Sequence, residues 1–233
     1  VLAHFDELAK DAAKSSETMR DDNKRFASLP KVVKAKLNVD GAKSKAISDK
    51  LIGVFFEDIS YAADGGLYAE LVQNRDFEYT SDDHKGWSAI TAWKSNAPIR
   101  IATENPLSKN NPHYAVIAAD TLYNEGWDGI VDRGAAYDFS IYARNISGEK
   151  KELSVALVAE DGNVMAEGKL KIVGKEWKRY TLALNTANKK RTKMYGDKAV
   201  NCRLVVAGKK DATVALDMIS LFPHDTYKGH GLR

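Results

Sequence analysis

One acidic side chain, Glu57, lies near the end of the most apolar run in the sequence. The run covers 51–59 and reads L-I-G-V-F-F-E-D-I. Such a continuous apolar stretch is typical of a strand that is buried on both faces, as in a parallel barrel or a central sheet. Barrel folds place their chemistry at the C-terminal ends of their strands. Glu57 is therefore the first candidate for a functional carboxylate, and the alternative is an acid that only marks the end of a strand.

The common catalytic motifs are absent from the sequence. It contains no G-x-S-x-G, no Walker loop, no H-E-x-x-H and no paired cysteines. The single cysteine, Cys202, lies in an apolar stretch and is predicted to be inert core. The five histidines lack the spacing of metal ligands, and the basic stretch 189–193 is predicted to be a solvated loop without nucleic-acid contacts.

Composition excludes several classes of partner. The chain has 233 residues, with 35 basic and 32 acidic side chains and a net charge of +3, which is too small to imply a nucleic acid. No apolar run approaches the roughly 20 residues that span a membrane. Because the chain opens Val-Leu-Ala-His, we interpret it as a piece of a longer protein, so that missing targeting signals say nothing about its destination.

The N-terminal third is predicted to hold a helix and a strand. Apolar side chains recur every seven residues at Phe5, Ala12, Met19 and Phe26, and Pro30 ends the pattern. This favours a linker helix docked on its own chain, with a partner-binding coiled coil as the alternative. Residues 32–39 alternate between apolar side chains and lysines, which predicts a half-buried strand.

From residue 80 onward the sequence predicts an antiparallel sandwich. Short alternating stretches are separated by turn signals, and Asp161-Gly162 marks a hairpin between two of them. The alternation slips near Asp217, as a β-bulge would require. The predicted strands are 99–102, 114–119, 137–144, 153–159, 164–169, 177–184, 202–206 and 214–222.

Two family resemblances cover the chain from about residue 51. Gly53, 55–59, 65–71 and 74–78 resemble the opening of the catalytic barrel in family 51 glycoside hydrolases, the α-L-arabinofuranosidases. A second set of residues is similar to carbohydrate-binding modules of families 4 and 9, which such enzymes carry as an insertion after the first barrel strand. That set comprises 106–107, 110–114, 124–130, Gly134, Tyr137, Ser140, Trp177 and Tyr180. The closing segment, 217–223 with 225–228 and 231–233, matches the return into the barrel.

The family 51 resemblance implies that this chain alone has no catalytic residue. Retaining glycosidases use two carboxylates, and in the family both lie on later barrel strands. Glu57 matches the acid that holds the arabinose hydroxyls. The resemblance to carbohydrate-binding modules implies one structural calcium, bound by Glu78 and Asp217 with the carbonyl of Asp76 as a third ligand, since calcium prefers several hard oxygens. The alternative is that backbone N–H groups satisfy both acids.

Sugar binding is expected to depend on aromatic rings, because the C–H faces of sugars stack on them. The candidates are Trp87, Trp93, Tyr114, Trp127 and Tyr142, whereas Trp177 is predicted to be core. For each candidate the alternative is core or interdomain packing.

We therefore predict a mainly β chain: an antiparallel jelly-roll sandwich of the carbohydrate-binding-module type, an N-terminal helix and an isolated first barrel strand. The expected parts are a linker helix (1–30), an accessory strand and the barrel strand (31–79), the sandwich (80–223) and a return linker (224–233).

The predicted function is the non-catalytic N-terminal portion of a secreted or periplasmic α-L-arabinofuranosidase. Its expected partners are arabinose-containing polysaccharide and the rest of the barrel, with self-association through 51–59 also open. The alternative is a stand-alone carbohydrate-binding or interdomain-packing module. The 51–59 run favours the enzyme, because a free-standing binding module has no use for a buried barrel strand.

Overall fold

The computed structural model describes residues 2–28, 34–43, 45–53, 55–147, 151–208 and 213–233. The chain divides into two compact units, Val1–Val54 and Phe55–Arg233, and each is described by itself. In the described part of the chain, no helix is both long and apolar enough to cross a membrane.

The first unit holds the predicted helix. Helix α1 runs over Leu2–Ser28, and a 3-10 turn, η1, follows at Gly41–Lys43. Within this unit the helix side chains from residue 6 onward are exposed, including those of Leu8, Met19 and Phe26. The strand predicted over 32–39 is absent from residues 34–39, which have no regular structure and are exposed. Residues 32 and 33 lie outside the described residues.

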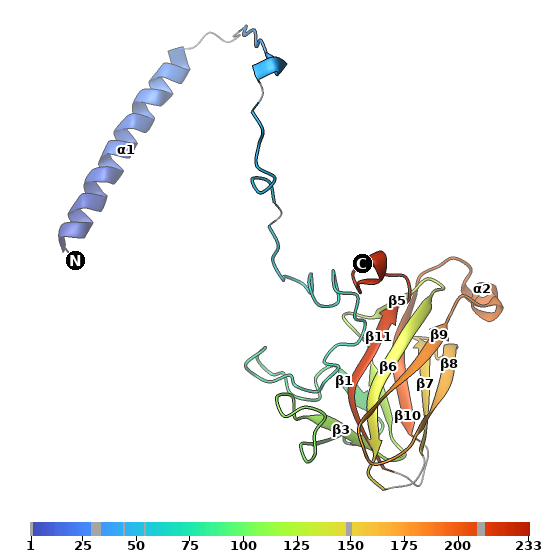
Figure 1. Cartoon of the computed structure of the whole chain (residues 1–233). Coiled ribbons are helices and arrows are strands. Elements are labelled where there is room, and N and C mark those ends of the chain that lie inside the picture. The colour runs from blue at the N-terminus through green and yellow to red at the C-terminus, as the bar shows by residue number, and fades with distance from the viewer. Residues whose placement is uncertain (1, 29–33, 44, 54, 148–150, 209–212) are drawn as a thin grey trace. The chain divides into compact units, whose positions relative to one another are not determined.

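The second unit is a two-layered antiparallel β-sandwich, as predicted (Figure 1). In the described part of the chain, one sheet has the order β1-β4-β10-β7-β8, with β5 also paired to β10, and the other has the order β2-β3-β11-β6-β9. The strands are β1 (Trp93–Ser95), β2 (Arg100–Ala102), β3 (Tyr114–Ile117), β4 (Thr121–Asn124), β5 (Ile130–Asp132), β6 (Ala136–Asn145), β7 (Lys151–Ala159), β8 (Val164–Ile172), β9 (Lys178–Asn185), β10 (Val200–Gly208) and β11 (Val214–Pro223).

Strict alternation along the long strands builds the core between the sheets. Tyr137, Phe139, Ile141 and Ala143 of β6 are buried, and so are the matching alternate residues of β7 and β10. Since successive strand side chains point to opposite faces, the same alternation places the intervening polar residues on the outer faces. Cys202 is buried in this core, and burial raises the pKa of its thiol to about 12.

The hairpin and the bulge are both confirmed. β7 pairs with β8 across Asp161-Gly162, where Gly162 has a φ of +85°. β11 changes register against β6 between Asp217 and Ser220, and Met218 within the bulge has a φ of 47°.

The barrel strand predicted over 51–59 is wrong for the described residues 51–53 and 55–59. They form no strand, and their large side chains are exposed, with Phe55 at 89%. The physical reason is that a strand is held by hydrogen bonds to a neighbouring strand, and none of the described pairings involves this segment. Apolar composition alone therefore does not form the element.

The basic stretch at 189–193 is a helix with a structural function, which corrects the predicted loop. Helix α2 (Lys189–Tyr195) is capped by Asn188, whose side chain accepts a hydrogen bond from Arg191 N. Arg191 is buried, and its Nε lies 2.8 Å from Oδ2 of Asp132, which is also buried. Tyr137 and Thr186 donate hydrogen bonds to the same carboxylate, and Arg191 also donates to three backbone carbonyls. This network joins α2 to β5, β6 and the loop after β9.

Residues 69–77 belong to the core of the sandwich. Leu71, Val72 and Phe77 are buried in the same cluster as the strands, so the unit includes residues that we assigned to the preceding segment. Glu70 is buried among them and accepts hydrogen bonds from Ser220 Oγ and Leu221 N at 2.6 and 2.9 Å. Burial raises its pKa despite these bonds. The buried carboxylate thus ties the loop to β11.

The chain enters and leaves the sandwich at one place. Ala69 N donates to the carbonyl of Gly231 at 2.8 Å, and Arg233 N donates to the carbonyl of Leu67 at 3.0 Å. Tyr68 and Leu232 form an antiparallel bridge between these contacts. The two connections of the sandwich therefore lie side by side.

Candidate functional site

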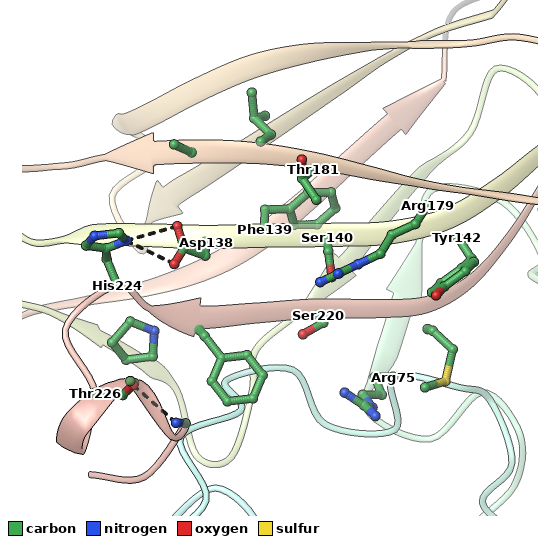
Figure 2. A pocket seen from close by; sticks show the side chains of 17 residues that line it. Arg75, Asp138, Phe139, Ser140, Tyr142, Arg179, Thr181, Ser220, His224 and Thr226 are labelled. Atoms are coloured by element: carbon green, nitrogen blue, oxygen red, sulfur yellow. Dashed lines mark hydrogen bonds and ion pairs between the residues drawn. The ribbon is translucent and has the colours of Figure 1, made fainter.

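A groove of about 820 Å³ opens on the outer face of the five-stranded sheet. Its floor comes from β6, β9 and the C-terminal half of β11, and its rim from Arg75 and the segment after β11 (Figure 2). Polar and apolar residues line it in nearly equal number.

Antiparallel pairing arranges the floor in rows across the three strands. One row joins Thr181, Ser140 and Ser220, and the next joins Ala183, Asp138 and Phe222. Tyr142 pairs with Arg179 in the row on the other side. Residues paired across antiparallel strands have neighbouring side chains on the same face. The floor therefore offers adjacent hydroxyl groups between two aromatic rings.

The charged groups of the groove differ in how they are paired. Nδ1 of His224 lies 3.0 Å from the Asp138 carboxylate, and both side chains are mainly exposed. Nη1 of Arg75 lies 3.3 Å from Oε2 of the buried Glu70. Arg179 is exposed and makes no hydrogen bond or ion pair with any described residue. Figure 2 shows it reaching from β9 toward Ser140, with Arg75 on the opposite side of β11.

A second group of functional interest lies at the bulge of β11. Asp217 is only 2% exposed, and its Oδ1 accepts a hydrogen bond from Met218 N at 2.7 Å. Burial, and then the charges of Asp76 and Glu78, raise the pKa of Asp217 to about 7. Asp76 and Glu78 are therefore close enough to Asp217 for their charges to act on its carboxyl group.

The donor chemistry of this group fits a hard cation, because two carboxylates and a carbonyl can supply oxygen ligands and a cation would relieve their repulsion. The alternative, that backbone N–H groups satisfy the acids, has support as well. His113 N donates to Oε1 of Glu78 at 2.7 Å, and the His113 ring contacts Oε2. Among the described residues, no three His, Cys, Asp or Glu side chains are gathered to hold a metal. The predicted calcium ligands are not such a group of three side chains, because the third ligand is the backbone carbonyl of Asp76.

Two of the predicted sugar-binding rings belong to the core, which corrects those predictions. Trp93 is 5% exposed, stacks on Phe77 and donates from Nε1 to the carbonyl of Asn74 at 2.7 Å. Tyr114 is 2% exposed and packs edge-on against Trp177. A buried ring with a satisfied polar atom has no face left for a ligand. Trp177 is partly buried against the cluster that contains Tyr114, in line with its predicted core role.

The remaining predicted residues lie outside the groove, except for Tyr142. Trp87 is partly buried and stacks on Tyr79 with a centroid distance of 4.5 Å. Trp127 donates from Nε1 to the carbonyl of Glu70 at 3.1 Å and contacts Tyr61. Its ring covers Gly65, where an added Cβ would lie 2.2 Å from the indole, so only glycine allows this contact. Glu57 is exposed in the segment without regular structure.

Most groove residues were missed by the sequence reasoning, although a signal for them was present. The alternation that assigns Tyr137, Phe139 and Ile141 to the core also assigns Asp138, Ser140 and Tyr142 to the opposite face. Strand β9 repeats this pattern with Arg179 and Thr181. The rows of paired residues could not be predicted, because they depend on the strand order.

Comparisons with known proteins give a consistent set of relatives. The chain is 40% identical to an extracellular exo-α-L-arabinofuranosidase from Streptomyces chartreusis, over 82% of this chain and 22% of that enzyme. It is 28% identical to α-L-arabinofuranosidase 1 of Arabidopsis thaliana, over 84% of this chain and 30% of that enzyme. The chain thus spans less than a third of these relatives. No protein-family model matches it.

A solved structure agrees with the sequence relatives. The arabinose-bound MgGH51 α-L-arabinofuranosidase has a TM-score of 0.61 and 28% identity, over 76% of this chain and 30% of that one.

Proposed function

This chain is homologous to part of the family 51 glycoside hydrolases, the α-L-arabinofuranosidases, and we propose that it forms the non-catalytic N-terminal portion of such an enzyme. In this proposal the sandwich is a carbohydrate-binding module, and the catalytic barrel is supplied by the rest of the polypeptide. The polymer that it binds is an arabinose-containing plant polysaccharide. The enzyme acts outside the cytoplasm, either secreted or in a periplasm, which the name of the Streptomyces relative supports.

The observation that carries the proposal is the groove on the five-stranded sheet. Sites for sugars combine ring faces with a few fixed polar groups. Here Tyr142 and Phe222 supply partly exposed rings, and the hydroxyls of Ser140 and Thr181 lie between them. Asp138 adds an acceptor for sugar hydroxyls.

The adjacent connections of the sandwich support its place as an insertion. A module inserted into another fold must return the chain close to where it left, because the host element continues from there. The contacts between Leu67–Ala69 and Gly231–Arg233 meet this condition. We propose that these two segments lead to and from the barrel.

The apolar residues ahead of the sandwich are proposed to contact the barrel. Phe55, Phe56 and Ile59 are large and exposed. Tyr61, two residues after Ile59, forms an aromatic pair with Trp127. Covering large apolar side chains stabilises by roughly 1.5–3 kcal/mol each. In this arrangement Glu57 would reach the arabinose hydroxyls only within the assembled catalytic pocket. Trp87 is retained as a second proposed sugar contact outside the groove.

A structural calcium at Glu78, Asp217 and the carbonyl of Asp76 is part of the proposal. It would supply a positive charge that links the loop 76–78 to the bulge of β11. The support is the burial of Asp217 next to two other acids, which leaves its negative charge poorly compensated.

The test of sugar binding is calorimetric titration of this chain with soluble arabinoxylan and with arabinan. Tyr142→Ala removes a groove ring and should weaken binding roughly tenfold, which corresponds to a lost stacking contact of about 1.4 kcal/mol. The matched control is Tyr123→Ala, since Tyr123 is a partly buried tyrosine on β4 of the other sheet. Equal losses in both variants, or no binding of either polymer, would contradict the proposal.

A hydrolysis assay tests the non-catalytic assignment. The chain should not cleave an aryl arabinofuranoside above background. Turnover that copurifies with the chain and disappears in Glu57→Gln would overturn this assignment.

A further inference from the structure

The groove contains one cation whose charge is uncompensated. Arg75 faces the buried Glu70, and the Asp138 carboxylate faces His224. Arg179 has no such partner among the described residues, although it lines the same groove. A guanidinium without an internal partner is free to bind an anion from solution, and its planar fork matches a carboxylate.

The surroundings of Arg179 complete a site for one carboxylate. Arg179 pairs in register with Tyr142, and the neighbouring row holds Thr181, Ser140 and Ser220. Figure 2 shows the Arg179 side chain extending toward Ser140, and the strand register makes Ser140 its diagonal neighbour on the same face. A carboxylate can accept hydrogen bonds from both groups at once. Tyr142 offers a ring beside this site for a neighbouring neutral sugar of the same polymer.

The other end of the groove limits the charge of the ligand. Asp138 lies on the same face, two residues from Ser140 along β6, and a second carboxylate placed there would be repelled. The groove therefore suits a polymer with occasional acidic units and neutral sugars between them. A uniformly charged polyanion fits poorly, in agreement with a net charge of only +3.

We propose that the groove selects a polysaccharide that carries uronic acid residues, with the uronate carboxylate bound by Arg179 and Ser140. This inference rests on the proposed sugar-binding function and narrows its ligand class. The neutral sugars on either side contact Tyr142 and the hydroxyl row. Arg75 adds a second positive charge at the rim, although Glu70 already neutralises part of it.

The experiment titrates this chain with a xylan that bears glucuronic acid and with the same xylan after chemical reduction of its carboxyl groups. The acidic form should bind roughly tenfold more tightly, which is the usual effect of one charge-assisted hydrogen-bonded contact. Arg179→Gln should remove that difference, so that the acidic and the reduced polymer bind with equal affinity. Arg100→Gln is the matched control, because Arg100 is an exposed arginine on β2 of the same sheet, outside the groove.

Each outcome separates the two levels of the proposal. Equal binding of both xylans, with Tyr142→Ala still weakening it, would overturn the uronate inference and leave the sugar-binding function intact. Binding of neither xylan, nor of arabinoxylan or arabinan, would overturn both. Free sulfate that competes as well as free glucuronate would show a general anion site and also overturn the inference. A loss in Arg100→Gln equal to that in Arg179→Gln would show a nonspecific charge effect and overturn it as well.

Discussion

The sandwich holds two carboxylates on neighbouring segments with opposite surroundings. Asp132, at the end of β5, is buried and bonded to Arg191, Tyr137 and Thr186. Asp138, six residues later on β6, is mostly exposed, and its side-chain partner among the described residues is the His224 ring. The first carboxylate is saturated by its own protein, and the second has acceptor capacity left for a ligand. The difference teaches that polar residues which hold this fold and those which can bind a partner are distinguished by burial and by how many hydrogen bonds the protein itself supplies.

Breaking the buried pair should have the largest effect on stability. Arg191→Ala leaves Asp132 buried without its cation, which typically costs about 3–5 kcal/mol and corresponds to a melting temperature lower by roughly 6–20 °C. Thermal unfolding followed by circular dichroism measures this. A loss below about 1 kcal/mol would mean that water replaces the guanidinium and that the pair is not structural.

Removing a bound calcium should have the next largest effect. A ligand present at a hundred times its Kd stabilises by about 2.7 kcal/mol, so a chelator should lower the melting temperature by roughly 5–10 °C. Asp217→Ala should abolish this sensitivity, and Asp120→Ala, at an acid elsewhere in the sandwich, should retain it. An unchanged melting curve in protein first loaded with calcium would contradict the metal site.

Acid should remove the contribution that the buried Asp132 carboxylate makes to the stability of the fold. Burial alone would raise the pKa of Asp132, but hydrogen bonds from Thr186, Arg191 and Tyr137 outweigh it and lower the pKa below its ordinary value of 3.8. The ionised group therefore contributes stability that is complete above that value and is lost as the pH falls through the lower folded-state pKa.

The expected result is a steeper loss of stability below about pH 4 in the parent than in Asp132→Asn, since each unit of pKa difference contributes about 1.4 kcal/mol. Denaturant unfolding between pH 2 and 6 measures the free energy of unfolding of both proteins. The contributions of other acids, such as Glu70, are the same in both and cancel in the difference. Parallel curves would show that the Asp132 pKa is not lowered by folding.

The groove pair should have the smallest effect. His224→Ala removes the exposed partner of Asp138, and such pairs contribute about 0–1 kcal/mol, so the melting temperature should fall by no more than roughly 4 °C. If this variant is as unstable as Arg191→Ala, the groove carboxylate is structural and the comparison between the two acids fails.

The long strands could be predicted from the sequence, because each contains several periods of alternating apolar and polar residues. Residues 137–144 and 153–159 each show several periods, and the structure has strands there. Strands β1, β4 and β5 have only three or four residues and were not predicted, because no clear alternation marks them. The equally short β2 and β3 lie within the predicted stretches 99–102 and 114–119. Helix α2 has seven residues and no apolar face, and its best signal was the cap at Asn188.

The prediction of a strand at 51–59 was wrong for a different reason. Its composition indicates a buried strand, but burial and pairing depend on partners that the run itself does not specify. The candidate site shows the same limit. Trp93 and Tyr114 have the right chemistry for sugar contact, yet they point into the core, whereas the polar face of β6 and β9 forms the groove. Residue type identified possible contacts, and only strand order determined which of them share a surface.

The hydrogen bonds that join Leu67 to Arg233 and Ala69 to Gly231 give the sandwich the character of a cassette. In the proposed insertion, the sandwich can replace a single turn of the host, since its two ends already lie side by side at the bridge of Tyr68 and Leu232. The entropy of closing a loop grows slowly with loop length, so folding the host costs little more with the cassette than with a short connection. Duplication, loss or exchange of the whole sandwich is thereby possible without disturbing the elements on either side of it.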